Sequence, residues 1–135
     1  MQKKKRVSYI ENFLSVLLTT AEVSDNVFVG TLPPTTDSEW EDMVCVEVQK
    51  VVDYNAYSTG SVLIYLYARP TGTPARKNVS LLNDMEKALS AAVEDSNDKY
   101  YSFYEQWRDN GYDDDRNFHY NVISLHFVVR YPVYK

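Results

Sequence analysis

The segment Met43–Ala68, MVCVEVQKVVDYNAYSTGSVLIYLYA, decides the fold of this 135-residue chain. In its first part valines alternate with polar or small residues, as in a strand with one buried face. The alternation returns after the turn-rich DYNAYSTG. The predicted buried faces are Val44, Val46 and Val48 in the first part, and Val62, Ile64, Leu66 and Ala68 in the last. Two alternating runs joined by turn residues predict an antiparallel hairpin.

Two segments with helical spacing lie on either side of this hairpin in the sequence. Their apolar residues recur every three or four positions, so each helix presents one apolar stripe. The stripes are Ile10, Phe13, Leu14, Leu17 and Leu18 near residues 8–20, and Leu81, Leu82, Met85, Ala88, Leu89, Ala92 and Val93 near residues 79–94. We expect both stripes to pack on one face of the sheet.

Three further segments have the character of strands. Val27–Val29 is a short apolar run followed by Gly30 and two prolines, which predicts an edge strand. In residues 100–107 one predicted face holds Phe103 and Trp107 and the other holds Tyr100 and Tyr104, so aromatic residues lie on both faces. This indicates a strand, although a short aromatic helix fits the same residues. Residues 123–131 alternate clearly, and the polar stretch 108–117 before them predicts a turn or loop. The order predicts a single α+β domain over residues 1–135, with a mainly antiparallel sheet, two helices on one face and a basic tail at residues 1–6.

The composition is that of an ordinary globular protein, with 44% apolar and 24% charged residues and a net charge of −5. Cys45 is the only cysteine, so no intrachain disulfide forms and folding in a reducing compartment is expected. The bases at residues 3–6 and the following FLSVLLTTA have the look of a signal peptide, but the helical spacing favours an amphipathic helix. No apolar run approaches the roughly 18 residues needed to cross a membrane.

Motifs for catalysis, cofactors and metals are absent from the sequence. It contains no glycine-rich phosphate loop and no nucleophile motif. His119 and His126 are predicted to point to opposite faces of one strand, so they cannot bind one metal together. The acidic residues around Gly111 lack the spacing of a calcium loop. We therefore expect no enzymatic activity, metal or cofactor; a small hydrolase that uses paired carboxylates stays a third possibility.

Aromatic and charged segments are the candidate contact surfaces. Aromatic residues make up 14% of the chain and are equally explained by strand propensity. The candidate interface residues are Tyr100, Tyr101, Phe103, Tyr104 and Trp107, together with Val27, Phe28 and Val29. Residues 94–116 carry eight acidic and three basic side chains, whereas Lys3, Lys4, Lys5 and Arg6 form a basic pole and a candidate charged contact. Such poles favour head-to-tail association, or are simply solvated.

A family resemblance rests on four segments in this order: TLPP at 31–34, YLYARPTG at 65–72, LLNDMEKALSAAV at 81–93 and ISLHFVVRYP at 123–132. Together with the leading helix, this layout resembles the small tail-terminator or tail-completion proteins of long-tailed bacteriophages and prophages. The resemblance covers most of residues 7–132 and concerns layout and hydrophobic pattern rather than a diagnostic motif. An acidic and aromatic insertion at residues 95–116 departs from the shortest members.

The resemblance implies a structural virion protein that forms a ring, expected to have six copies, on the end of the tail tube. The implied partners are other copies of the chain, the tail-tube protein and the head–tail connector protein. The implied location is the cytoplasm of the bacterial host during assembly and then the virion tail. The alternative is a non-enzymatic α+β binding module that recognises a protein or single-stranded nucleic acid through Tyr65, Tyr67 and Arg69. A sequence pI near 5.0 argues against nucleic acid as a specific ligand.

Overall fold

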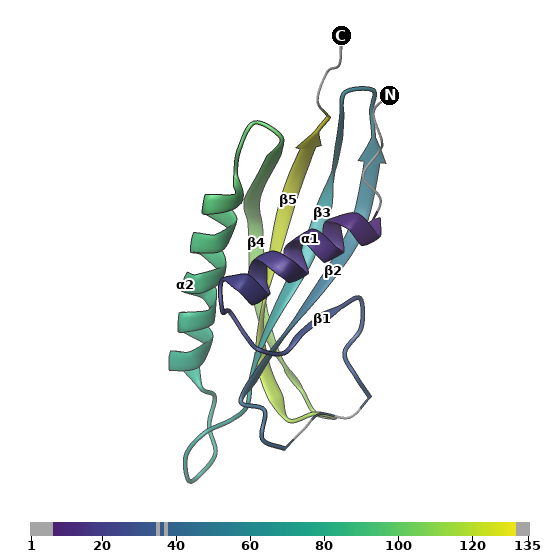
Figure 1. The fold of residues 1–135 in the computed structure, drawn as a ribbon. Helices are drawn as coiled ribbons and strands as arrows, with labels where there is room; N and C mark the ends of the chain where they lie inside the picture. The colour runs from purple at the N-terminus through teal and green to yellow at the C-terminus, as the bar shows by residue number, and fades with distance from the viewer. Residues whose placement is uncertain (1–6, 35, 37, 132–135) are drawn as a thin grey trace.

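The computed structural model describes residues 7–34, 36 and 38–131, which form two helices and a five-stranded sheet (Figure 1). In chain order the elements are α1 (Val7–Thr20), β1 (Val27–Val29), β2 (Asp42–Asp53), β3 (Tyr57–Ala68), α2 (Val79–Ser96), β4 (Tyr101–Asp113) and β5 (Phe118–Arg130). The sheet order is β1-β2-β3-β5-β4. Only the β1–β2 pair is parallel. The predicted α+β fold with a mostly antiparallel sheet is confirmed.

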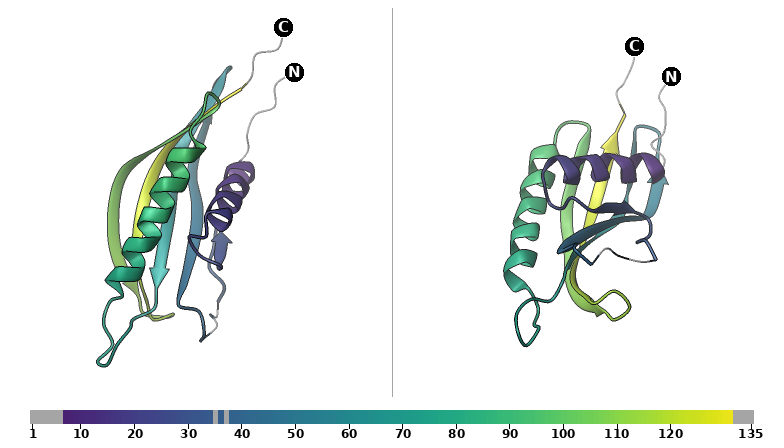
Figure 2. Two further views of the ribbon diagram at one scale, coloured as in Figure 1. Left: turned by 60° about the vertical axis from the view of Figure 1, so that its left-hand side comes forward. Right: turned by 60° about the horizontal axis from the view of Figure 1, so that its bottom comes forward.

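The main core lies between the helices and one face of the sheet. The helix α1 contacts β1 and β2, and α2 contacts β3 and β4, so the two helices cover different parts of the sheet (Figure 2). Buried residues of this cluster include Leu14 of α1, Leu89 of α2, Ile64 of β3 and Phe127 of β5. Burying a side chain of this size stabilises the fold by about 1.5–3 kcal/mol. The α2 helix begins after Asn78, whose side chain accepts a hydrogen bond from the Leu81 amide at 3.1 Å.

The hairpin of β2 and β3 contains a close approach that requires glycine. A register shift between Val48 and Lys50 bulges β2 toward its partner. A Cβ atom at Gly60 would collide with the Lys50 carbonyl oxygen and lie 2.7 Å from Cζ of Phe127. Glycine at this position therefore lets the bulge and the Phe127 ring occupy the same level of the sheet.

The prediction of a turn or loop at residues 108–117 is wrong for most of this segment. β4 continues to Asp113, and only residues 114–117 form the turn to β5, which begins at Phe118. β4 is the last strand of the sheet, and residues 104–110 are all exposed. An exposed edge strand has polar side chains, as a loop does, so composition could not separate the two. The choice left open for residues 100–107 is also resolved, because they belong to a strand from Tyr101 onward.

The hairpin between β2 and β3 is tighter than the sequence indicated. β3 begins at Tyr57, before the expected Val62, and the turn is closed by a 2.8 Å hydrogen bond from the Tyr54 amide to the Tyr57 carbonyl. Lys3, Lys4, Lys5 and Arg6 lie outside the described residues. Neither helix of the described part is long and apolar enough to span a membrane.

Candidate interaction site on the open sheet face and the β4 edge

The face of the sheet opposite the helices has no helix over it in the described part of the chain. We call it the open face. The exposed aromatic residues of β4 on this face are Tyr104 and Trp107, with 54% and 48% of their surface accessible. The Tyr104 ring lies 4.9 Å from the ring of His126 on β5. Part of this face is covered by Phe28, Leu32 and Trp40, which pack against a second buried cluster. Tyr104 and Trp107 are exposed on the same face and form a candidate contact surface.

A bulge places these two side chains on the same face. Strict alternation along the sequence assigns Tyr104 and Trp107 to opposite faces. The register shifts between Glu105 and Trp107, so Gln106 is the extra residue and Trp107 pairs with Ser124. Tyr104 pairs with His126, which is on the same face as Ser124. The prediction that Trp107 shares a face with Phe103 was therefore wrong, because a single bulged residue reverses the alternation beyond it.

The free edge of β4 is the second part of the site. No strand of the described residues pairs with β4 on the side away from β5. Its exposed middle, residues 104–110, therefore offers unpaired backbone groups to a further strand. The bulge at Gln106 and the charges of Glu105, Arg108 and Asp109 are features that reduce non-specific edge pairing. Only a partner that matches the bulge and these charges fits this edge well.

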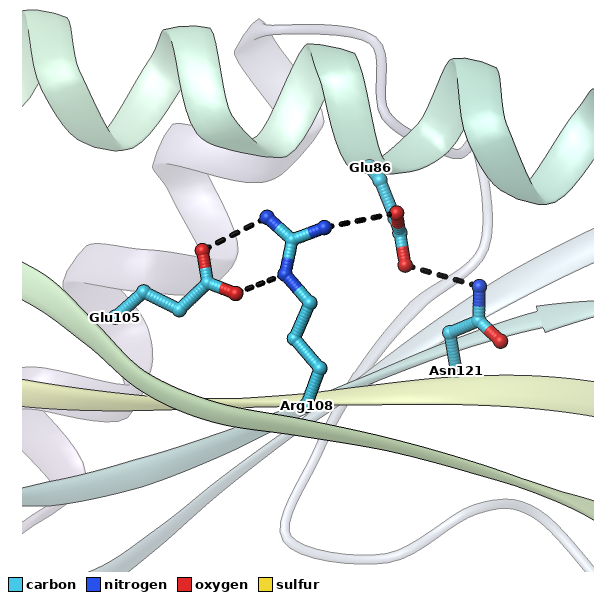
Figure 3. A network of polar contacts seen from close by, with 4 residues as sticks. All are labelled: Glu86, Glu105, Arg108 and Asn121. Atoms are coloured by element: carbon cyan, nitrogen blue, oxygen red, sulfur yellow. Dashed lines mark hydrogen bonds and ion pairs between the residues drawn. The ribbon is translucent and has the colours of Figure 1, made fainter.

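An ionic network on the helix-covered face holds β4 to α2 (Figure 3). Arg108 forms a two-bonded ion pair with Glu105, with one nitrogen–oxygen distance of 2.8 Å, and contacts Glu86 of α2 at 3.1 Å. Asn121 of β5 donates to the other oxygen of Glu86 at 2.9 Å. The hydrogen bond from Arg108 lowers the pKa of Glu105, and the same bond raises the pKa of Arg108. The network joins β4 to α2 and β5 beside the bulge.

The structure separates the five aromatic residues that were grouped as one candidate interface. Phe103 is 3% exposed and belongs to the core, so it offers no surface to a partner. Tyr101 is half-buried, stacks on Phe13 of α1 at 4.6 Å and shares a 2.7 Å hydrogen bond with the hydroxyl of Tyr9. Tyr100 is half-buried and lies just before β4. Tyr104 and Trp107 remain as the exposed pair.

The predicted edge strand β1 occupies the edge opposite β4. Val29 is exposed, whereas Phe28 packs against Trp40 with 5.6 Å between ring centroids. β1 covers only Val44–Val46 of β2. Beyond Val46 no described strand pairs with β2 on the side away from β3, although the Val48 amide there donates a hydrogen bond to the Glu11 side chain at 3.4 Å. The sheet thus has two chemically different open edges, one at β4 and one at β1 and the distal half of β2.

A groove on the open face was not predicted from the sequence. It has a volume of about 480 Å³ and is lined by Tyr65, Tyr67 and Tyr120, by the side chains of Glu47, Asp113 and Arg116, and by residues 30–32. We call it the tyrosine groove. Sequence analysis identified Tyr65 and Tyr67 but could not place them beside Glu47 and Tyr120, because these residues come from three strands whose register is a tertiary property.

Two of the three residues named for the alternative binding module, Tyr67 and Arg69, make contacts within the fold. Tyr67 is 7% exposed and packs at right angles to Phe118. The Arg69 guanidinium lies 4.5 Å from the centre of the Phe118 ring, and its Nε donates to the Trp40 carbonyl at 2.8 Å. A stacking platform for bases needs exposed rings and accessible cations, and these two side chains meet neither condition.

Within residues 7–34, 36 and 38–131, no group of three or more His, Cys, Asp or Glu side chains is placed to hold a metal ion. The register puts His119 and His126 on opposite faces of β5, as predicted. Cys45 is buried, and this burial raises the pKa of its thiol to about 11.

Comparison with models of known protein families finds no match, and comparison with curated proteins finds no significant match either.

Proposed function

We propose that this chain is a structural protein of a phage or prophage tail, which forms a ring on the end of the tail tube and joins the tube to the head connector. The observation that carries this proposal is the pair of unlike open edges on opposite sides of one sheet. The order and hydrophobic pattern of the segments, which resemble tail-terminator proteins, supply the tail context. The chain acts by binding and not by catalysis in this proposal.

A closed ring requires two different complementary patches on each subunit. β4 supplies one patch, with its free edge and the exposed Tyr104 and Trp107. The edge formed by β1 and the distal half of β2 supplies the other, and Val29 is exposed there. Aromatic residues at the centre of an interface often contribute about 2 kcal/mol or more each to binding. The exposed pair on β4 is therefore the expected energetic centre of the subunit contact.

A non-enzymatic binding module is the second candidate function, and the open face with Tyr104 and Trp107 favours it equally. In this case the partner is a different protein. Light scattering coupled to size exclusion separates the two functions, since a ring has a mass several times that of the 15.7 kDa chain.

Tyr104→Ala and Trp107→Ala test the assignment. Each variant should leave the free energy of unfolding within about 0.5 kcal/mol of the parent, because both side chains are exposed. Each should weaken ring formation, or the capping of tail tubes if rings form only on tubes. Val79→Ala is the control, because Val79 is 63% exposed at the start of α2, outside both patches. If both β4 variants assemble normally at low protein concentration, Tyr104 and Trp107 do not contribute to the subunit contact. A chain that neither forms rings nor caps tubes contradicts the function itself.

A further inference from the structure

The floor of the tyrosine groove is built from three tyrosine rings in mutual contact. The ring centroids of Tyr65 and Tyr120 are 5.7 Å apart at an interplanar angle of 62°, and those of Tyr67 and Tyr120 are 5.4 Å apart at 49°. A Cβ atom at Gly111 would collide with the Tyr120 ring, so the glycine in β4 lets this ring lie across the strand. Tyr67 is buried, whereas Tyr65 and Tyr120 are half-buried, so the rings of Tyr65 and Tyr120 are the ones that a ligand in the groove can contact.

The walls of the groove are fixed by hydrogen bonds. The Gly30 amide donates to the Val46 carbonyl at 2.8 Å, and Gly30 has a φ of +79°, a conformation that glycine adopts easily. Arg116 donates from Nη2 to the Pro33 carbonyl at 3.0 Å and from Nη1 to Asp113 at 3.0 Å. The Arg116 guanidinium is therefore committed to holding the two walls together.

Acidic side chains outnumber basic ones around the groove, with Glu47 and Asp113 against Arg116 in its lining. Burial raises the pKa of Cys45 to about 11 and raises the pKa of Tyr65, and the charge of Glu47 contributes next in both cases. Glu47 is exposed at the rim, and Asp114 and Asp115 are exposed in the adjacent turn. The rim thus carries carboxylates in excess of its one guanidinium.

We infer that the tyrosine groove binds a lysine or arginine side chain of the basic segment Lys3–Arg6 from a second copy of the chain. Aromatic ring faces attract ammonium and guanidinium groups, and a carboxylate at the rim adds a charge partner. The chain itself carries the matching ligand, since residues 3–6 are four consecutive bases. The inference rests on the proposed function only in expecting copies of the chain to associate.

The experiment uses the full chain with Lys3, Lys4, Lys5 and Arg6 changed to alanine, so that its groove has no basic segment of its own. The probe is a synthetic peptide of residues 1–8, titrated at low salt while the ring resonances of Tyr65 and Tyr120 are followed by NMR. We expect saturable shifts that weaken as salt is added. Glu47→Gln and Tyr65→Leu in this chain should weaken binding about tenfold. Glu94→Gln and Tyr57→Leu are matched controls at exposed sites outside the groove, and they should bind as the parent does.

Equal binding of a peptide with alanine at positions 3 to 6, or unchanged affinity in both groove variants, would overturn the inference. A separate experiment in the unaltered chain tests whether the basic segment comes from a second copy. Docking between copies predicts that the groove resonances shift with protein concentration. A groove already occupied in dilute monomer would show that the segment belongs to the same chain and would refute the second-copy arrangement. If the chain binds the peptide but forms no ring, the binding site in the tyrosine groove is supported and the proposed tail function is contradicted.

Discussion

Gly60 and Gly111 are both strand glycines against which a neighbouring group packs, but the neighbours differ in how far they can move. A side chain at Gly60 meets the backbone carbonyl of Lys50, whereas a side chain at Gly111 meets only the outer atoms of the Tyr120 ring. A ring can rotate away at small cost, and a backbone carbonyl in a paired strand cannot. The two positions therefore differ in what they contribute: one sustains the hairpin and the other shapes the tyrosine groove.

Gly60→Ala should lower the free energy of unfolding by about 3 kcal/mol or more, because the β2 bulge must shift and the Phe127 ring must leave its site. Gly111→Ala is the internal control and should cost about 1 kcal/mol or less. Urea unfolding followed by tryptophan fluorescence measures both. Similar losses at the two positions would mean that the bulge is as free to move as the Tyr120 ring.

Single residues also mark where prediction from sequence succeeded and failed. The alternation of Val44 to Val48 and of Val62 to Ala68 identified β2 and β3, because one face of each strand is buried in the core. Arg108 to Asp113 carry no such alternation, since an edge strand exposed to solvent needs none. Trp107 was assigned to the wrong face because the Gln106 bulge depends on its pairing with β5. The tyrosine groove was missed for the same reason: its members meet only once strand register is set.

At the scale of the element, the bulge in β4 determines which side chains of this strand lie on each face of the sheet. It directs Trp107 to the open face and Arg108 to the helix-covered face, where Arg108 pairs with Glu105 and Glu86. Removing the extra residue makes the pairing regular and keeps Trp107 opposite Ser124 and Arg108 opposite Ile123. If all residues stayed and the bulge were lost, every later residue of the strand up to the turn would change face.

Deletion of Gln106 should therefore leave Trp107 on the open face and Arg108 beside Glu86, because Trp107 then follows Glu105 directly and keeps Ser124 as its pair. We expect the tryptophan emission to stay unshifted. The two tryptophans are Trp40 and Trp107, so the measurement is made in a Trp40→Phe background. Gln106→Ala keeps the residue count and should also leave the emission unchanged. A blue shift in the deletion variant would show that Trp107 has turned toward α2 and that Gln106 is not the extra residue.

At the scale of the whole molecule, the folded state holds several weak acids in their neutral form. Burial is the first cause that raises the pKa of Cys45 to about 11 and the pKa of Tyr65, Tyr67 and Tyr101 above the usual tyrosine value. In the unfolded chain these groups ionise at about 8.5 to 10. A raised pKa in the folded state contributes stability below the unfolded pKa, and this contribution is lost as the pH rises through the folded value.

The free energy of unfolding should thus stay level from pH 7 to about 8.5 and fall steadily above about pH 9. Urea titrations at successive pH values measure it. Cys45→Ala removes the group with the lowest unfolded pKa, so the fall should begin nearer the tyrosine range at about pH 10. A parent chain whose stability is constant through about pH 10.5 would contradict the neutral state of the buried groups.

The position of β3 and β5 side by side in the middle of the sheet governs how this chain can fold. The β2–β3 and β4–β5 hairpins each join neighbours across short turns and can form independently. The β3–β5 ladder instead pairs residues about 50 to 70 positions apart, so its formation must close a long loop that contains α2. Contacts of such separation slow folding. Until the β3–β5 contacts form, each hairpin keeps one unpaired strand edge. The longer this state lasts, the greater is the risk that the chain aggregates through these edges.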